Sequence, residues 1–198
     1  MKLKASTATQ RRAARAAASV SLALFVAACA QAPRETFDLT TGAGALRGVA
    51  LRSGPAIFVP EPSALAPTGS DRIVVRAADE SVAVLPGVQW SESLPRLFQR
   101  RLIDALQRSG LSASSDMGAP MKLQTDVQRF EIDIARNLAV IKVSVQLVDQ
   151  SSGRAKASRI FVEEAPAPYH VGSPAVQTLS DAAARIALHI GQWTRARM

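Results

Sequence analysis

Four side chains stand out as candidate acids or bases, but none is accompanied by the other parts of an active site. Glu131 and Asp133 stand two residues apart on an expected strand, so they share a face and could act as paired carboxylates. The simpler interpretation, which we favour, is that they form the solvated side of that strand. His170 lies in a proline-rich loop. The simplest interpretation of His189 is an ordinary histidine on the flank of a helix.

The sequence motifs of several enzyme and cofactor-binding classes are absent from the chain. There is no G-x-S-x-G elbow, no G-x-x-x-x-G-K-[ST] phosphate loop, no G-x-G-x-x-G fingerprint and no H-E-x-x-H zinc motif. One cysteine excludes an intramolecular disulfide and a multi-cysteine metal site, and two histidines leave little for zinc. The sequence therefore predicts a protein that is not an enzyme and that holds no metal and no cofactor apart from covalent lipid.

The single cysteine, Cys29, stands in a sequence that is typical of lipid attachment. The residues before it, Val26-Ala27-Ala28, resemble the bacterial lipobox, in which a branched apolar residue and two small residues precede the cysteine. Small side chains let a peptidase close on the backbone, and the thiol takes a thioether-linked diacylglycerol before cleavage between Ala28 and Cys29. The resemblance also implies a further acyl chain on the new amino terminus. The alternative is an incidental cysteine in a signal peptide that is cut elsewhere, for example near Ala32.

Residues 1–28 have the three-part layout of a secretory signal peptide. A basic stretch ends at Arg15, an apolar stretch follows, and small residues lead to the cysteine. The apolar stretch has about a dozen residues, which is too short to cross about 30 Å of hydrocarbon as a helix. Arg11-Arg12 could be a twin-arginine signal, but the hydrophobic pair that usually follows is missing, so we favour the general secretion route.

Lipidation at Cys29 would attach the chain to a membrane without a transmembrane helix. Each buried methylene contributes about 0.8 kcal/mol, and two or three acyl chains hold a protein stably. Ala30 and Gln31 follow the cysteine and neither is Asp. By analogy with enteric lipoproteins this favours the outer membrane, with the protein on its periplasmic face. Residues 29–36 would then be a short lipidated tether, and residues 37–198 the folded domain.

The charge of the expected mature chain argues against nucleic acid as a partner. The formal net charge is +8, but residues 1–28 hold five basic residues and no acidic one, which leaves +3 on the rest. A domain with so little excess charge lacks the electrostatic footprint of a nucleic-acid-binding protein.

Apolar residues make up 47% of the chain, which excludes a disordered polar tail. A domain of about 170 residues can bury about 70% of its unfolded surface without disulfides.

Two amphipathic helices are expected to form one layer of the fold. In residues 94–106, apolar side chains recur at spacings of three and four, and Pro95 is tolerated in the first turn. Ser173-Pro174 begins a second helix of about 20 residues, because one apolar face continues to Trp193. That face carries the longest regular stripe in the chain, which consists of Val176, Leu179, Ala183, Ile186, Ile190 and Trp193.

A three-stranded meander is expected between residues 123 and 164, where apolar and polar side chains alternate. The alternation changes phase near Gln128-Arg129, which predicts a β-bulge. Residues 72–76 and 82–85 predict a hairpin, and residues 56–59, bounded by prolines, predict an edge strand. Because one face of the meander is apolar, helices must cover it. We therefore predict an α+β fold, in which an antiparallel twisted sheet packs against the two helices.

The first helix and the tryptophan that precedes it, Trp90, offer candidates for partner binding. Arg96, Arg100, Arg101 and Arg108 could meet an acidic partner or lipid headgroups. A solvated helix face explains these arginines more simply. Trp90 precedes the helix, and indole rings are enriched both at interfaces and in cores, so either role is open. The partner-binding candidates are Trp90, Arg96 and Arg100.

The order of these motifs resembles that of the ABC-type transport auxiliary lipoproteins, the PqiC-like group. The shared pattern is a strand that ends in arginine (72–76), a tryptophan about a dozen residues later (Trp90), and a leucine-rich helix (94–106). The segment 129–161 also resembles the β-hairpin region of that family. The resemblance covers about residues 35–195, together with the lipid-anchor start.

The resemblance implies a lipid-anchored, non-catalytic component of a transporter. Lipoproteins of this family work beside an ABC permease, an ATPase and an MCE-domain protein that carry lipids or other hydrophobic solutes across the cell envelope. This protein would dock the periplasmic MCE assembly at the outer-membrane side, with a homo-oligomeric ring as one arrangement. Two alternatives remain open: an outer-membrane scaffold or assembly factor that binds a β-barrel or peptidoglycan, and a small periplasmic enzyme.

Overall fold

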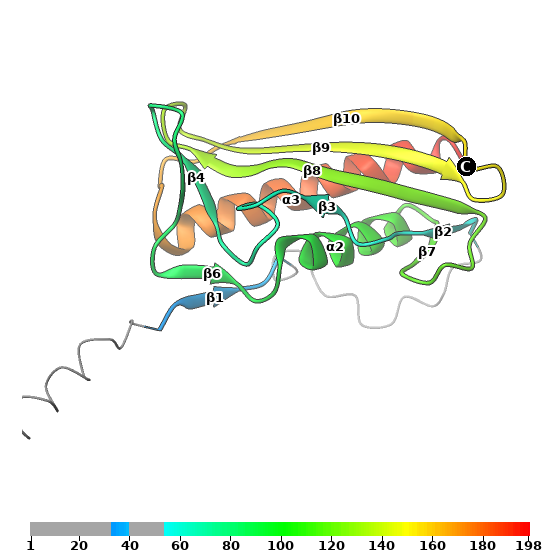
Figure 1. Cartoon of the computed structure of the whole chain (residues 1–198), viewed down its shortest axis with the longest axis horizontal. Coiled ribbons are helices and arrows are strands. Elements are labelled where there is room, and N and C mark those ends of the chain that lie inside the picture. The colour runs from blue at the N-terminus through cyan, green and yellow to red at the C-terminus, as the bar shows by residue number, and fades with distance from the viewer. Residues whose placement is uncertain (1–32, 40–53) are drawn as a thin grey trace, which may run out of the picture. The chain divides into compact units, whose positions relative to one another are not determined.

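The computed structural model describes residues 33–39 and 54–198, in which a long sheet is covered on one face by two helices (Figure 1). Residues 1–32 and 40–53 lie outside the described part. The expected signal peptide, Cys29, the cleavage point after Ala28 and most of the expected tether therefore lie outside it as well.

Three long strands form the antiparallel meander that the alternation predicts. They are β8 (Met121–Asp133), β9 (Leu138–Asp149) and β10 (Ala155–Pro166), and each pairs with the next along nearly its whole length. The register of β8 against β9 shifts between Val127 and Arg129, which confirms the expected bulge. The extra residue keeps apolar side chains on the core face on both sides of the bulge.

The sheet is mixed rather than wholly antiparallel, because the other side of β8 accepts three short parallel strands. β2 (Ala56–Phe58), β3 (Ser63–Ala64) and β4 (Val74–Arg76) pair with β8 near its start, middle and end. β2 also pairs with β7 (Ser112–Ser114), so it lies inside the sheet and the expectation of an edge strand is wrong. The prolines only flank β2, so its own N–H groups remain available to both neighbours.

β4 turns back into β5 (Val82–Val84), which confirms the expected hairpin. A separate pair of strands brings the amino-terminal end of the domain onto the fold, where β1 (Glu35–Phe37) pairs in parallel with β6 (Val88–Trp90). The first two residues of β1 belong to the segment that was expected to be tether. The strand β1 therefore includes two residues of the expected tether.

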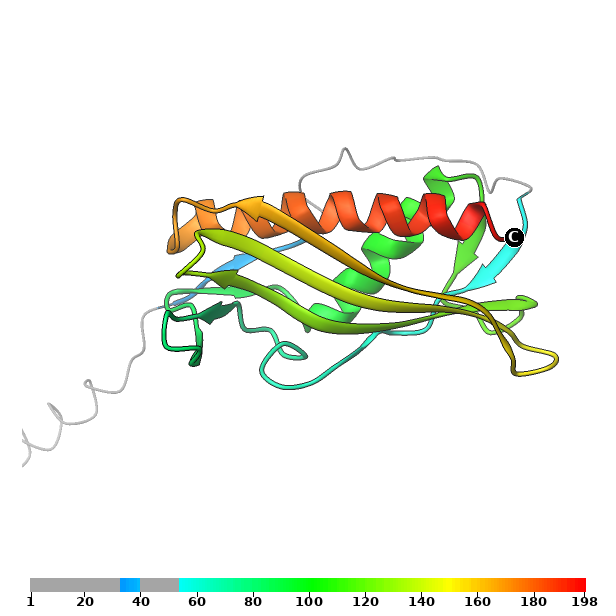
Figure 2. The same ribbon diagram turned by 90° about the horizontal axis from the view of Figure 1, so that it is seen from above.

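Two helices form the second layer, as expected. α2 spans Leu94–Arg108 and α3 spans Gly172–Arg195, so both lie within a residue or two of their predicted starts. The helices contact each other, and α3 runs along β9 and β10 (Figure 2). The α+β class and the two-helix layer are confirmed.

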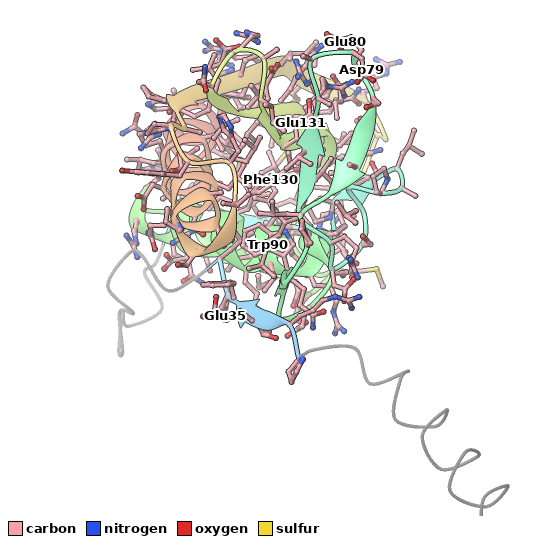
Figure 3. All side chains as sticks on the ribbon, turned by 90° about the vertical axis from the view of Figure 1, so that its left-hand side faces the viewer. Glu35, Asp79, Glu80, Trp90, Phe130 and Glu131 are labelled. Carbon is pink, nitrogen blue, oxygen red and sulfur yellow. The ribbon has the colours of Figure 1, made fainter. Side chains whose placement is uncertain are left out.

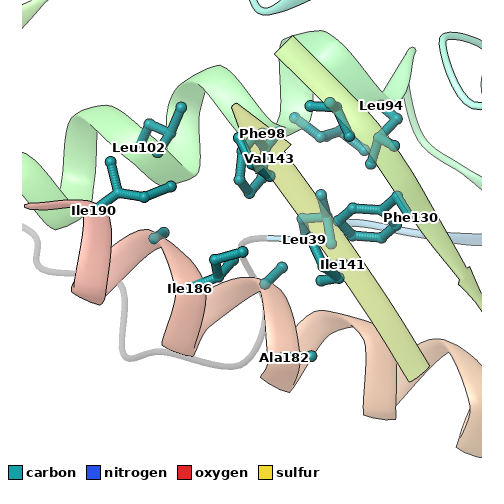
Figure 4. Close-up of a cluster of buried hydrophobic side chains, with 14 of the residues drawn as sticks. Leu39, Leu94, Phe98, Leu102, Phe130, Ile141, Val143, Ala182, Ile186 and Ile190 are labelled. Atoms are coloured by element: carbon teal, nitrogen blue, oxygen red, sulfur yellow. The ribbon is translucent and has the colours of Figure 1, made fainter. Parts of the chain in front are cut away.

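The apolar stripes of both helices face the sheet and form the core. Phe130 of β8 is its aromatic centre, because Trp90 and Phe98 meet its ring edge to face at centroid distances of 6.0 and 6.3 Å. Such pairs contribute about 0.5–1.5 kcal/mol beyond the area that they bury. Figure 4 shows Phe130 in one buried cluster with side chains from α2, α3 and β9, among them Leu94, Leu102, Ile141, Val143, Ile186 and Ile190.

The close approach of the two helices depends on Gly191 of α3. A Cβ at this position would lie 2.7 Å from Ser109 Oγ and 2.8 Å from the carbonyl oxygen of Ala105. We expect Gly191→Val to lower the free energy of unfolding by about 2 kcal/mol, because overpacking costs about 1–3 kcal/mol. Denaturant unfolding followed by circular dichroism measures this loss. Gly118→Val is the control, since a Cβ there meets nothing within 4 Å; equal losses in the two variants would contradict the prediction.

Candidate functional site

The paired carboxylates lie in a buried ion cluster on the sheet face that points away from the helices (Figure 3). Glu131 is only 2% exposed and Asp133 is buried too, so the expectation that they form a solvated strand face is wrong. Arg76 of β4 donates from Nε to Glu131 Oε1 at 2.8 Å and from Nη2 to Oε2 at 3.2 Å. Arg129 donates from Nε to Glu131 Oε1 at 2.6 Å and from Nη2 to Asp133 Oδ2 at 3.4 Å.

Arg136 extends this ion cluster to β10. Its backbone N–H donates to Asp133 Oδ1 at 3.1 Å, and its Nη2 donates to Glu164 Oε1 at 2.6 Å. The hydrogen bond with Glu131 raises the pKa of Arg76, and the one with Glu164 raises that of Arg136. Both buried carboxylates therefore accept hydrogen bonds from arginines and tie three strands together, an arrangement that suits a structural role better than proton transfer.

The two histidines do not form catalytic pairs in the described part of the chain. His189 is exposed on α3, with Nδ1 4.0 Å from Glu163 Oε2, and Arg185 donates to the other oxygen of the same carboxylate at 2.6 Å. His189 is therefore the helix-flank residue that the simpler interpretation describes. The Nε2 atom of His170, in the loop before α3, is buried and has no hydrogen-bond partner among the described residues.

Residues 33–39 and 54–198 contain neither a cluster of metal ligands nor a helix that could span a membrane. Within these ranges, no three His, Cys, Asp or Glu side chains come together as ligands for a metal ion. No helix of the described residues combines the length and the apolar character needed to span a bilayer.

Trp90 lies in the core, so its candidacy as a partner-binding residue is wrong. Its side chain is 1% exposed and packs on Phe130, which leaves no surface for a partner to touch. Its backbone N–H donates to the carbonyl oxygen of Asp71 at 2.8 Å, and the next residue, Ser91, donates to that of Phe37 at 2.7 Å. Trp90 thus anchors the entry to α2, as the alternative core interpretation predicts.

Arg96 and Arg100 lie on the exposed face of α2, where the helical periodicity places them. Both share one carboxylate: Arg96 Nε lies 3.6 Å from Glu92 Oε2, and Arg100 Nη1 lies 2.8 Å from Glu92 Oε1. We call Glu92, Arg96 and Arg100 the α2 patch. With two cations for one anion the α2 patch carries a net positive charge, and its side chains remain accessible to a partner.

Arg101 is buried, so the interpretation of all four arginines as a solvated face is wrong for this one. It donates through Nη2 to the carbonyl oxygen of Leu39, next to β1. Burial lowers the pKa of Arg101. Arg101 lines a groove of about 190 Å³ between α2 and α3, together with Asp104, Ala105, Arg108, Ala184, Arg185 and Leu188.

One family model carries the same description as the resemblance in the motifs of this chain. The family model of the ABC-type transport auxiliary lipoprotein component matches residues 37–191. An uncharacterized protein of Bradyrhizobium diazoefficiens is 30% identical over 174 residues, which cover 83% of this chain and 46% of that protein. The chain thus spans about half the length of this curated relative.

Solved structures share the fold. A crystal structure of a Xanthomonas campestris protein is 24% identical, covers 84% of this chain and 93% of its own, and superposes with a TM-score of 0.67. A second crystal structure, of an uncharacterized protein, reaches the same TM-score at 16% identity over 82% of this chain and 99% of its own. At these identities the likeness concerns the fold alone. With its family model matched across nearly the whole described domain, the chain belongs to the ABC-type transport auxiliary lipoprotein component family.

Proposed function

We propose that this protein is the lipid-anchored, non-catalytic docking subunit of an MCE-type ABC transporter that moves lipids or other hydrophobic solutes across the cell envelope. The observation that carries this proposal is the position of the family domain, residues 37–191, directly after the lipobox at Cys29. The family supplies the auxiliary role in ABC transport. The lipid cargo, the MCE partner and the outer-membrane position are our proposal.

The short distance along the chain between Cys29 and β1 supports a role close to a membrane. β1 begins at Glu35, six residues after the cysteine. Six extended residues span at most about 20 Å. A lipidated Cys29 would therefore hold the domain against the membrane surface, which we take to be the periplasmic face of the outer membrane. A docking subunit needs this proximity.

The chemistry of the described domain also suits docking better than catalysis. The buried carboxylates Glu131 and Asp133 are held by arginines, which keeps them from acting as free bases. The α2 patch, by contrast, offers exposed cations on a rigid helix. We place the contact with an acidic surface of the MCE or permease subunits on Arg96 and Arg100.

Charge reversal on the α2 patch tests this contact. We expect Arg96→Glu/Arg100→Glu to lower the recovery of MCE and permease subunits about tenfold in pull-downs from detergent extracts, because two surface ion pairs worth about 0.7 kcal/mol each amount to a factor of ten. Lys122→Glu/Lys142→Glu is the control, since it makes the same change of charge on the sheet. Equal recovery from the two double variants would contradict the placement of the contact on α2.

The same pull-down with the unmodified chain tests the proposed function itself. Co-purification of MCE, permease and ATPase subunits is the expected result. Recovery of an outer-membrane barrel protein or peptidoglycan without any transporter subunit would replace our proposal with the scaffold function.

A further inference from the structure

The loop that leads from β10 into α3 is exposed, apolar and free of charged side chains. It consists of residues 167–171, and we call it the α3 entry loop. Tyr169 and Val171 are 65% and 67% exposed, whereas His170 between them is half-buried, with its Nε2 atom inside. Residues 165–180 contain no Asp, Glu, Lys or Arg, although these types make up 20% of the chain. The loop therefore presents two large side chains to solvent without a charge of its own.

The start of α3 adds backbone N–H donors to the same surface. No side-chain oxygen caps the first turn of this helix, and no acidic residue lies in that turn. The first N–H groups of a helix have no partner within it, and they carry the positive end of the helix dipole. Phosphate groups are ligands that such a helix end accepts. An apolar loop next to these donors matches the boundary between the acyl chains and the phosphates of a bilayer.

The α3 entry loop lies at the end of the sheet where the expected tether joins the domain. The backbone N–H of Ala167 donates to the carbonyl oxygen of Asn137 at 2.8 Å, which places the loop beside the turn between β8 and β9. β4 and β5 lie at the same end of β8, and the chain then reaches Gly87, whose carbonyl oxygen accepts from the N–H of Glu35 at 2.8 Å. Figure 1 and Figure 2 both show the start of α3 and β1 at this end.

We propose that the α3 entry loop is a second contact between this protein and the membrane, in which Tyr169 and Val171 enter the headgroup region of a phospholipid bilayer. Tyrosine is enriched at this depth, because its ring is apolar and its hydroxyl stays hydrated. The N–H groups at the start of α3 then face lipid phosphates. The proposal rests on the lipid anchor at Cys29, which is part of the proposed function, and it needs no transporter subunit.

A second contact gives the domain one orientation on the membrane. Acyl chains on the tether keep β1 within about 20 Å of the bilayer but leave the domain free to rotate. With the loop seated, β10 leads away from the bilayer, and the turn between β9 and β10 lies about 35 Å farther along this strand. Figure 3 shows Asp79 and Glu80 at the margin of this end opposite Glu35, so a membrane on the Glu35 side meets neither acid.

Fluorescence quenching in vesicles tests the contact. The mature lipidated chain with Tyr169→Cys is labelled with an environment-sensitive fluorophore and reconstituted in phosphatidylethanolamine and phosphatidylglycerol, with or without nitroxide-labelled lipid. We expect quenching at least about threefold stronger than with Ser152→Cys, because a seated loop lies about 5–10 Å into the headgroup boundary. Ser152 is exposed in the turn between β9 and β10, at the other end of the sheet. Equal quenching at the two positions, or none at either, would overturn the proposal.

A charge on the loop tests whether its apolar side chains make the contact. We expect Val171→Asp to lower the quenching of the label at residue 169 at least about twofold, because transfer of a carboxylate out of water is costly. Val162→Asp is the control, since it places the same charge on a 56% exposed valine of β10, outside the loop. Equal losses of quenching in the two variants would contradict the proposal.

Failure of the anchor and failure of the loop contact give different results. Cys29 is the only cysteine of the chain, so fluorophore on the parent protein would reveal a free thiol there and would overturn both the anchor and this proposal. A label at residue 169 that is not quenched, on a chain whose Cys29 carries lipid, would overturn the loop contact alone.

Discussion

Replacing Cys29 with serine is expected to abolish the membrane attachment of this protein. A serine hydroxyl does not form the thioether to diacylglycerol, so the precursor would receive neither that lipid nor the acyl chain that follows it. Two or three acyl chains hold a protein stably on a bilayer, whereas a chain without them has no comparable attachment. Labelling with radioactive palmitate, followed by salt-washed membrane fractionation, should show labelled parent protein in the membrane and unlabelled, released variant.

A neighbouring substitution separates this effect from a general defect in the signal peptide. Ala30→Ser changes the residue after the cysteine, keeps the lipobox and should keep both the label and the membrane fraction. Palmitate on the Cys29→Ser variant would contradict the assignment of the anchor. So would mass spectrometry that finds a free thiol on Cys29 in the mature parent protein.

The largest effect on stability is expected at Glu131. Glu131→Ala would leave the guanidinium groups of Arg76 and Arg129 without the buried carboxylate that both of them contact. Breaking a buried ion pair from one side costs about 3–5 kcal/mol. We expect about 3 kcal/mol here, because the two arginines are partly exposed and water can reach them. Urea unfolding, followed by tryptophan fluorescence, measures the loss.

Glu164→Ala is the matched control, because it removes the same kind of side chain from the same ion cluster. Its carboxylate also binds an arginine, Arg136, but its side chain is 41% exposed, against 3% for Glu131. An exposed pair is worth about 0–1 kcal/mol, so this variant should lose less than about 1 kcal/mol. Similar losses in the two variants would show that burial does not control the strength of this ion cluster.

The expectations that the structure confirms come from patterns that repeat along the chain. Alternation in residues 123–164 predicts the meander, and its change of phase predicts the bulge between Val127 and Arg129. Spacings of three and four predict α2 and α3. These patterns are reliable because a strand or helix with one buried face must repeat apolar residues at its own period.

The expectations that fail concern strand pairings and side chains whose partners are distant in sequence, such as the edge position expected for β2. Glu131 and Asp133 occupy the polar positions of the strand pattern, yet both are buried. Their burial is possible because β4 pairs with β8 and brings Arg76, 55 residues away in sequence, beside Glu131. Arg101 is one of the four arginines interpreted as a solvated face of α2, yet it is buried and donates a hydrogen bond to the carbonyl oxygen of Leu39. A local pattern records how polar a position is, and it does not record which distant group neutralises that polarity.

The lipobox at Cys29, the two-layer α+β class and the family can all be argued from the amino-acid sequence alone, because each depends on neighbouring residues or on a regular period. The burial of Trp90 and the ion cluster around Glu131 required the folded arrangement. In each case the outcome depends on which strands lie side by side, and long-range pairing is set by the packing of the whole domain.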